Sequence, residues 1–250
     1  MRTVSSRTAV VLFAVILSGA GCGSKAASTM NVDCAANPAG YNPTIVPADF
    51  STTIDNQWLA YTPGTVFKYV RSDGNSVEQD VASDTRVIMG VTTLTVHDFM
   101  KTPSGTLLED TYDYFAQDTA GNVWYFGEDT KAYSGTMVST AGTWYGGVDC
   151  AMPGIVMKAS PQISDSYRQE YLPGQAEDQA DVVSLTETVT VPFGTLGNCM
   201  MTKEYSALAP GDIENKYYCA HVGLLRSHDI GTIDAGSLED LASINGKTMQ

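Results

Sequence analysis

Short runs of alternating apolar and polar residues, separated by turn-forming residues, constrain the fold of this chain most strongly. Successive side chains of a strand point to opposite faces, so alternation predicts strands, and intervening Gly, Asn and Asp predict turns. We therefore expect an all-β or β-rich fold: a single antiparallel, curved sheet or a partial barrel or sandwich, with little helix. The predicted strands are 65–71, 84–89, 91–100, 107–117, 122–129, 166–172, 181–193, 198–208, 213–220 and 224–228, and the candidate helical turns are 176–181 and 237–242.

The N-terminal segment predicts export. Two arginines precede the apolar run 9–17, which leads through small residues into Cys22. Such a run is too short to span a bilayer and is typical of a secretory signal. The cysteine at its end predicts a bacterial lipoprotein in which Cys22 becomes the lipidated first residue. The alternative is simple secretion after cleavage at Ala20, because Gly19 stands where lipoprotein signals usually carry Leu.

Composition divides the chain into three segments. Residues 1–21 are the predicted signal peptide, 22–55 a lipid-anchor tether and N-terminal extension, and 56–250 a single β-rich domain. We expect the protein at the cell envelope, anchored to the membrane on its extracytoplasmic side. The membrane, reached through the N-terminal lipid, is then its predicted partner, and its oligomeric state stays open.

The cysteine pattern predicts two disulfides. Of five cysteines, Cys22 is reserved for the lipid, and the remaining four suit an oxidising compartment. Cys199 and Cys219 flank a Pro-Gly turn between two predicted strands, so they fall nearly opposite each other in a hairpin. We therefore predict the pair Cys199–Cys219, which leaves Cys34–Cys150 to tie the N-terminal segment to the body.

The chain is strongly acidic. Its net charge is −14, and removing the first 21 residues, which hold two arginines and no acid, makes it −16. Such a charge argues against nucleic-acid binding and against adsorption to anionic membrane surfaces. Solubility is the simple interpretation, and a bound cation or a basic partner is the alternative.

The segment 109–129 is the richest in chemistry. Gly121 suits the left-handed position of a three-residue loop that pairs Asp118 with Asn122. A mixture of aromatic and acidic residues predicts a partly polar concave face that contacts a ligand, although aromatic cross-strand pairs also stabilise ordinary sheets. Strand alternation places six candidate ligand-binding side chains on one face: Asp110, Tyr112, Tyr114, Trp124, Phe126 and Glu128.

Arg168 completes the predicted binding residues. It lies in a Tyr-Arg-Gln-Glu-Tyr run of a chain that has few cations. A salt bridge to one of the many acids is its simpler role, and binding of a carboxylate or other anion is the alternative. Calcium is a weak candidate ligand of clustered oxygens, but the loop 118–122 lacks the alternating acids of a calcium loop. We predict no cofactor and no metal site.

Catalytic motifs are missing from the sequence. The three histidines, His97, His221 and His228, lie far apart, and no nucleophile elbow or phosphate-binding loop is present. Asp110 and Glu128 are the carboxylate pair that would act together in a hydrolase if they shared a face. We predict no catalytic residue and favour a protein that is not an enzyme.

Several segments resemble a family of exported bacterial proteins, many of them lipoproteins. The most specific is Asn-Val-Trp-Tyr-Phe-Gly-Glu-Asp at 122–129, and further similar segments are 56–58, 61–65, 109–113, 153–155, 167–171, 216–218 and 222–224. The family has no assigned reaction, so the resemblance supplies no catalytic residues. It implies one exported β-rich domain with a curved sheet similar to periplasmic lipoprotein-carrier folds.

These observations lead to a functional expectation. We expect an extracytoplasmic lipoprotein that binds a small amphipathic ligand, a glycan or a cation in an aromatic and acidic concavity, without catalysis. One alternative is a carboxylate-dependent hydrolase of envelope or extracellular polymers. A second alternative is a structural surface protein.

Overall fold

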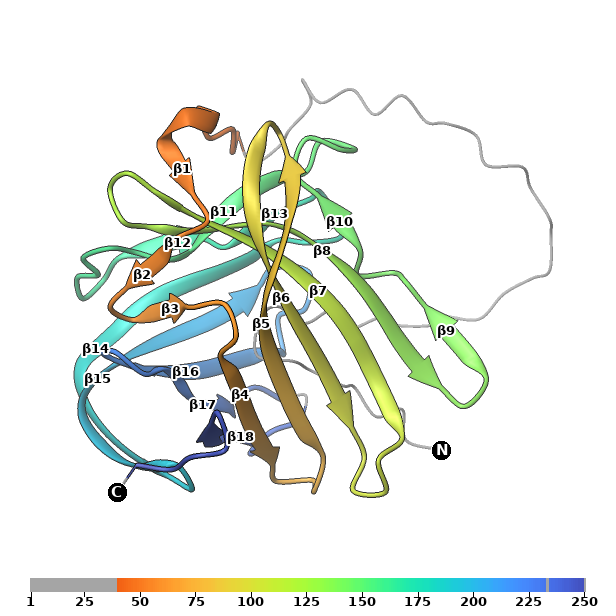
Figure 1. The fold of residues 1–250 in the computed structure, drawn as a ribbon, viewed down its shortest axis with the longest axis vertical. Helices are drawn as coiled ribbons and strands as arrows, with labels where there is room; N and C mark the ends of the chain where they lie inside the picture. The colour runs from red at the N-terminus through yellow and green to blue at the C-terminus, as the bar shows by residue number, and fades with distance from the viewer. Residues whose placement is uncertain (1–39, 233, 250) are drawn as a thin grey trace.

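The structure, a computed structural model, describes residues 40–232 and 234–249. The predicted signal peptide, Cys22 and Cys34 lie outside these residues. Within them the chain is almost entirely β-structure, with one short 3-10 turn, η2 (Pro47–Asp49), and no α-helix. The predicted all-β class is therefore confirmed (Figure 1).

One antiparallel sheet contains nearly all of the strands. Its order is β12-β14-β15-β16-β17-β18-β4-β5-β6-β7-β8-β11-β13, with β1, β9 and β10 added at its sides. The strands are β1 (Phe50–Ser51), β2 (Ile54–Asn56), β3 (Leu59–Tyr61), β4 (Val66–Arg71), β5 (Ser76–Ile88), β6 (Val91–Lys101), β7 (Leu107–Asp118), β8 (Val123–Ser134), β9 (Met137–Ser139), β10 (Trp144–Tyr145), β11 (Met152–Met157), β12 (Ser166–Arg168), β13 (Glu170–Tyr171), β14 (Asp178–Val191), β15 (Gly194–Ser206), β16 (Ile213–Cys219), β17 (Gly223–Asp229) and β18 (Leu238–Ile244).

The two edges of this sheet meet. Its edge strands β12 and β13 are consecutive in the chain, so the sheet bends round until it nearly closes (Figure 1). We call the place where they meet the seam. Gly154 in β11 permits the seam, because a Cβ there would lie 2.3 Å from the carbonyl carbon of Gln169 and 2.5 Å from the carbonyl oxygen of Arg168. Only glycine allows two backbones to approach so closely.

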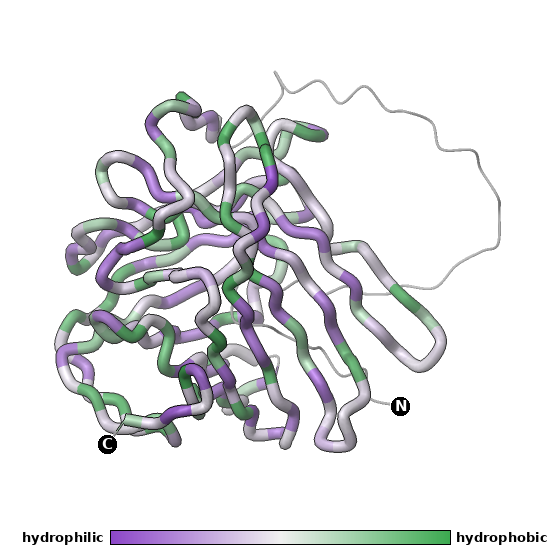
Figure 2. The backbone as a smooth tube through the Cα atoms, viewed as in Figure 1, coloured by the Kyte–Doolittle hydropathy of each residue, from purple (hydrophilic) through white to green (hydrophobic). Residues whose placement is uncertain are grey.

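The main hydrophobic core lies on the inner face of the curved sheet. Every second residue of β5, β6 and β7 is buried there, as the alternating colours along the strands in Figure 2 indicate. The buried aromatic residues of this core include Tyr69, Phe115 and Tyr125. A smaller cluster lies on the outer face, where Phe50 packs edge-to-face against Phe126 at 5.3 Å. The sheet therefore has a large inner core and a minor outer one.

The strand predictions hold except in the two segments that were candidates for helical turns. Residues 176–181 lead into β14, and 237–242 belong largely to β18. The pairing of β18 with both β17 and β4 satisfies its backbone groups, and Leu241 is fully buried in the core. Long-range pairing therefore outweighs the weak local helical preference.

The predicted disulfide between Cys199 and Cys219 is confirmed. It joins the neighbouring strands β15 and β16 across a sequence separation of 20, with Cα atoms 4.3 Å apart. Cys150 also takes part in a disulfide. Its predicted partner Cys34 lies outside the described residues, so the second pairing stays a prediction.

Candidate binding site

The turn of the β7–β8 hairpin forms as predicted. Asp118 and Asn122 pair at 2.9 Å between backbone nitrogen and oxygen, and Gly121 adopts a φ of 89°. Farther from the turn, a β-bulge interrupts the ladder between Tyr114 and Phe115. A bulge adds one residue to one strand and so exchanges the faces of all residues beyond it.

The bulge moves Glu128 to the inner face. Glu128 lies directly opposite Asp113, and both side chains are buried, at 4% and 2% exposure. The predicted common face of Glu128 and Asp110 is therefore wrong. Gly127, beside the bulge, adopts a φ of 144°, and a Cβ there would lie 2.4 Å from the carbonyl oxygen of Trp144. The close approach of β10 thus requires glycine next to the bulge.

Carboxyl groups are the most unusual feature of the interior. Burying an ionised carboxylate is costly unless it is paired or protonated. Among the described residues Lys216 is the only buried cation, whereas nine carboxyl side chains are buried. These nine are Asp98, Glu109, Asp113, Glu128, Glu170, Glu204, Asp212, Asp229 and Glu239.

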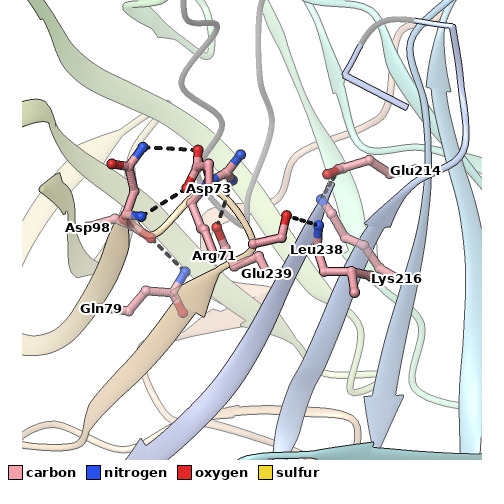
Figure 3. A network of polar contacts seen from close by, with 10 residues as sticks. Arg71, Asp73, Gln79, Asp98, Glu214, Lys216, Leu238 and Glu239 are labelled. Atoms are coloured by element: carbon pink, nitrogen blue, oxygen red, sulfur yellow. Dashed lines mark hydrogen bonds and ion pairs between the residues drawn. The ribbon is translucent and has the colours of Figure 1, made fainter. Parts of the chain in front are cut away.

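The two cations of the interior are already engaged. The Lys216 Nζ lies 2.8 Å from Glu204 and 3.6 Å from Glu214. The guanidinium of Arg71, which is 10% exposed, lies 3.1 Å from Glu239. Figure 3 shows these groups together on neighbouring strands. The cations therefore neutralise only part of the buried acid.

Other buried acids rely on neutral donors. The amide of Gln79 donates to Asp98 at 2.7 Å, a contact also drawn in Figure 3. The hydroxyl of Tyr125 donates to Asp113 at 2.6 Å. Glu170 differs, because neither of its carboxyl oxygens has a hydrogen-bond partner although the side chain is fully buried.

Burial favours the protonated form of these acids. It raises the pKa of Asp113 to about 7, an effect that the Tyr125 hydroxyl opposes and Glu109 reinforces. It also raises the pKa of Glu239 to about 7, although Arg71 lowers it. The pKa of Glu128 lies well above its ordinary value because of burial and the neighbouring Asp113. Protons therefore supply some of the missing positive charge near neutral pH.

A cavity adjoins this acidic interior. Its walls are mostly aromatic and aliphatic, with polar groups from Gln79, Gln169 and Lys216. The space open to the centre of a water molecule is about 20 Å³, enough for about one water. We call this space the inner cavity. Its full lining is Leu59, Ala60, Tyr61, Phe67, Tyr69, Gln79, Val156, Gln169, Lys216, Tyr218, Gly223 and Leu224.

The β2–β3 hairpin covers one side of the inner cavity. It forms a separate two-stranded sheet, and all three residues of β3 line the cavity. Its attachments to the main sheet are local: the Asn56 amide donates to the carbonyl of Gly121 at 2.8 Å, and the His221 backbone nitrogen donates to Gln57 at 2.6 Å. The hairpin is thus held by few bonds, unlike the continuous ladders of the sheet.

The other predicted residues of the β7–β8 hairpin lie on the outer face. Asp110 contacts the His97 ring nitrogen at 2.6 Å, and the Tyr112 ring stacks on His97 at 4.3 Å. Tyr114 accepts a hydrogen bond from Arg86 at 3.1 Å. The remaining two, Trp124 and Phe126, pack against Phe50. These side chains share a face, as predicted, but that face is not the one that encloses the inner cavity.

Arg168 lies at the seam, away from both groups. Its guanidinium lies over the ring of Tyr171 at 4.7 Å and over that of Tyr41 at 5.6 Å. It also donates to the backbone carbonyl of Glu177 at 3.4 Å. The structure therefore does not bring Tyr112, Trp124, Glu128 and Arg168 around one cavity.

The sequence analysis missed the acids that the structure gathers inside. Asp98 carried a usable signal, because it occupies an inner position of β6 in register with the apolar residues Leu94, Val96 and Met100. An acid in an otherwise apolar alternation indicates a buried polar group. Glu170 carried no such signal, since its burial depends on the seam.

Comparisons with known proteins are sparse. No protein-family model matches the chain, and no curated protein matches it. A Bacteroides fragilis protein described as exported, with a YmcC-like fold, is 14% identical over 75% of this chain and 98% of that chain, with a TM-score of 0.44. A Parabacteroides distasonis protein described as a lipoprotein is 13% identical over 75% and 97%, with a TM-score of 0.41. Likeness at this level establishes no shared function.

Two searches of the described residues gave negative results. No helix within 40–232 and 234–249 has the length and apolar character needed to cross a membrane. In the same residues, no three His, Cys, Asp or Glu side chains converge closely enough to hold a metal ion. The buried acids are instead spread along the wall of the interior.

Proposed function

We propose that this chain is an exported, lipid-anchored protein that binds a small amphipathic ligand in the inner cavity. The carrying observation is a cavity with aromatic walls and three polar side chains, Gln79, Gln169 and Lys216, that a weakly attached hairpin covers. Ligand sites combine apolar walls with a few polar groups in this way. In the closed form the cavity holds about one water, so binding requires the hairpin to move outward.

Export and anchoring rest on other features. The N-terminal pattern that ends at Cys22 is that of a lipoprotein signal. The disulfide between Cys199 and Cys219 fits an oxidising, extracytoplasmic compartment. Mass spectrometry of the protein purified from its native envelope tests both points, because a lipidated Cys22 adds the mass of its acyl chains. An unmodified N-terminus at Cys22 or Gly21 contradicts anchoring.

The same geometry bears on the alternative of a hydrolase. Asp110 lies on the outer face and Glu128 on the inner one, so this carboxylate pair does not act on one substrate. No other observation favours catalysis over binding.

Titration with the neutral fluorescent probe N-phenyl-1-naphthylamine tests the binding function. We expect a saturable rise in fluorescence at one probe per chain. Val156→Phe, which extends a lining residue into the cavity, should weaken binding by at least about tenfold, or about 1.4 kcal/mol. Val156→Ile serves as the matched control with a smaller added volume. The absence of saturable binding, or equal binding by Val156→Phe, contradicts the proposal.

A further inference from the structure

The interior has more negative groups than partners for them. Nine carboxyl side chains are buried in the described residues, against one buried lysine. That lysine, Lys216, is shared between Glu204 and Glu214, and Arg71 is taken by Glu239. A buried carboxyl group left without a cation must keep a proton or receive a positive charge from outside the chain.

Glu170 is the group most in need of such a charge. It is fully buried at the seam, and both of its oxygens lack a hydrogen-bond partner. Burial raises the pKa of Glu170 most, and the carboxylate of Asp178 raises it further; Trp144 and Lys216 lower it. An unsatisfied buried carboxyl group costs free energy in the folded protein, which a suitable ligand would recover.

The position of Glu170 connects it to the inner cavity. Gln169, the preceding residue, lines the cavity, and so does Lys216. The indole of Trp144 is also buried, packs edge-to-face on Tyr125 at 5.3 Å and has no hydrogen-bond partner on its own nitrogen. Trp144 lies opposite Glu128 in the β8–β10 ladder. Aromatic rings and carboxylates thus lie together at this end of the cavity.

This combination selects a chemical class of ligand. Aromatic faces attract ammonium groups through cation–π interactions, and a desolvated carboxylate strengthens the attraction. The carboxyl groups are spread over several strands and do not converge on a point. That spread suits a charged group carried on an extended body better than a compact metal ion.

We propose that the ligand of the inner cavity is an organic ammonium ion with an apolar body, and that Glu170 is its counter-ion. This inference rests on the binding function proposed above. The apolar body would contact the aromatic wall near Tyr61 and Tyr218, and the ammonium group would lie at the Glu170 end. Binding would release the proton that Glu170 otherwise holds, so that the carboxylate and the ammonium pair.

Tryptamine and tryptophol test this inference as a matched pair. They share the indole body and differ in the terminal group, a cationic amine in one and a neutral alcohol in the other. Isothermal titration at pH 7 should show tryptamine binding at least about tenfold more tightly than tryptophol. Titration of tryptamine in two buffers of different ionisation enthalpy should also reveal proton release.

Variants of the acids assign the preference to Glu170. Glu170→Gln should remove the preference for the amine and leave tryptophol binding unchanged. Asp110→Asn on the outer face, the matched control, should leave the preference intact. Thermal unfolding and the intact Cys199–Cys219 disulfide verify that each variant is folded, and Glu128→Gln, which should reduce the preference in part, is the second variant if Glu170→Gln fails to fold.

The outcomes separate the two proposals. Equal binding of the two probes, or an unchanged preference in Glu170→Gln, overturns the ammonium inference. Binding of N-phenyl-1-naphthylamine without any binding of tryptamine also overturns it but leaves the binding function standing. Failure of all three probes overturns both proposals.

Discussion

The inner and outer faces of the β7–β8 hairpin carry the same residue types in opposite chemical situations. On the outer face, Asp110 is partly exposed and contacts His97 at 2.6 Å. On the inner face, two residues away from it along β7 and β8, Asp113 and Glu128 lie opposite each other in the interior. One face therefore holds a solvated acid with a partner, and the other holds acids that burial keeps protonated.

The contrast shows that acidity alone does not mark a site. An exposed ion pair contributes little to stability and is easily replaced. A buried carboxyl group depends on every neighbour, so its protonation and stability report on the closure of the sheet. The inner face is consequently where ligands, protons and folding are coupled.

The largest expected effect comes from opening the seam, which removes the contrast between the faces. Gly154→Ala places a Cβ against the backbone of Gln169 at 2.3 Å. We expect a loss of about 4 kcal/mol or more in the free energy of unfolding, measured by urea denaturation. Gly197→Ala is the control, because its Cβ would meet only the Thr188 hydroxyl at 3.6 Å. Similar effects of both substitutions would contradict the role of the seam.

Removal of a single cation sharpens the contrast further. Lys216→Met leaves Glu204 and Glu214 in the interior without their shared partner. Removing one member of a buried ion pair costs about 3–5 kcal/mol, and we expect this loss in thermal and urea unfolding. Lys131→Met, on the exposed side of β8, should change stability by less than about 0.5 kcal/mol. A small effect of Lys216→Met would mean that protons already neutralise its partners.

The pH dependence of stability follows from the inner acids. Burial raises the pKa of Asp113 and of Glu239 to about 7 in the folded chain, whereas unfolded carboxyl groups titrate near about 4. The folded state binds more protons between these values, so stability falls as pH rises from about 4 through about 7. We expect a loss on the order of 2 kcal/mol per group between about pH 5 and pH 8.5, measured by urea unfolding across pH. Asp113→Asn should flatten the profile, and a profile that rises with pH would contradict this assignment.

The smallest expected effect is on the outer face. Asp110→Asn weakens its contact with His97, whose side chain is 28% exposed. Partly exposed pairs contribute less than about 1 kcal/mol, so unfolding should change by no more than that. The steep part of the pH profile should also be retained, in contrast to Asp113→Asn. A large loss of stability in Asp110→Asn would show that the two faces are energetically alike.

Local chemistry determined the parts of this protein that depend on few residues. The alternation of side chains predicted most strands, and the turn at Gly121 and the disulfide between Cys199 and Cys219 formed as expected. Such features involve neighbours in sequence or in one hairpin, so the residues themselves specify them. The export signal is likewise written in consecutive residues, although its fate in the mature protein stays a prediction.

Only the tertiary structure decided which side of the sheet each acid faces. One extra residue at the β7–β8 bulge turned Glu128 from the predicted outer position to the interior. Closure at Gly154 then brought Glu170 to the same interior from a distant part of the chain. A strand has a side-chain period of two, so a shift of one residue reverses every assignment beyond it. The sequence by itself determined that this is an exported-type, acidic β-protein, whereas sheet closure decided where its charge is buried.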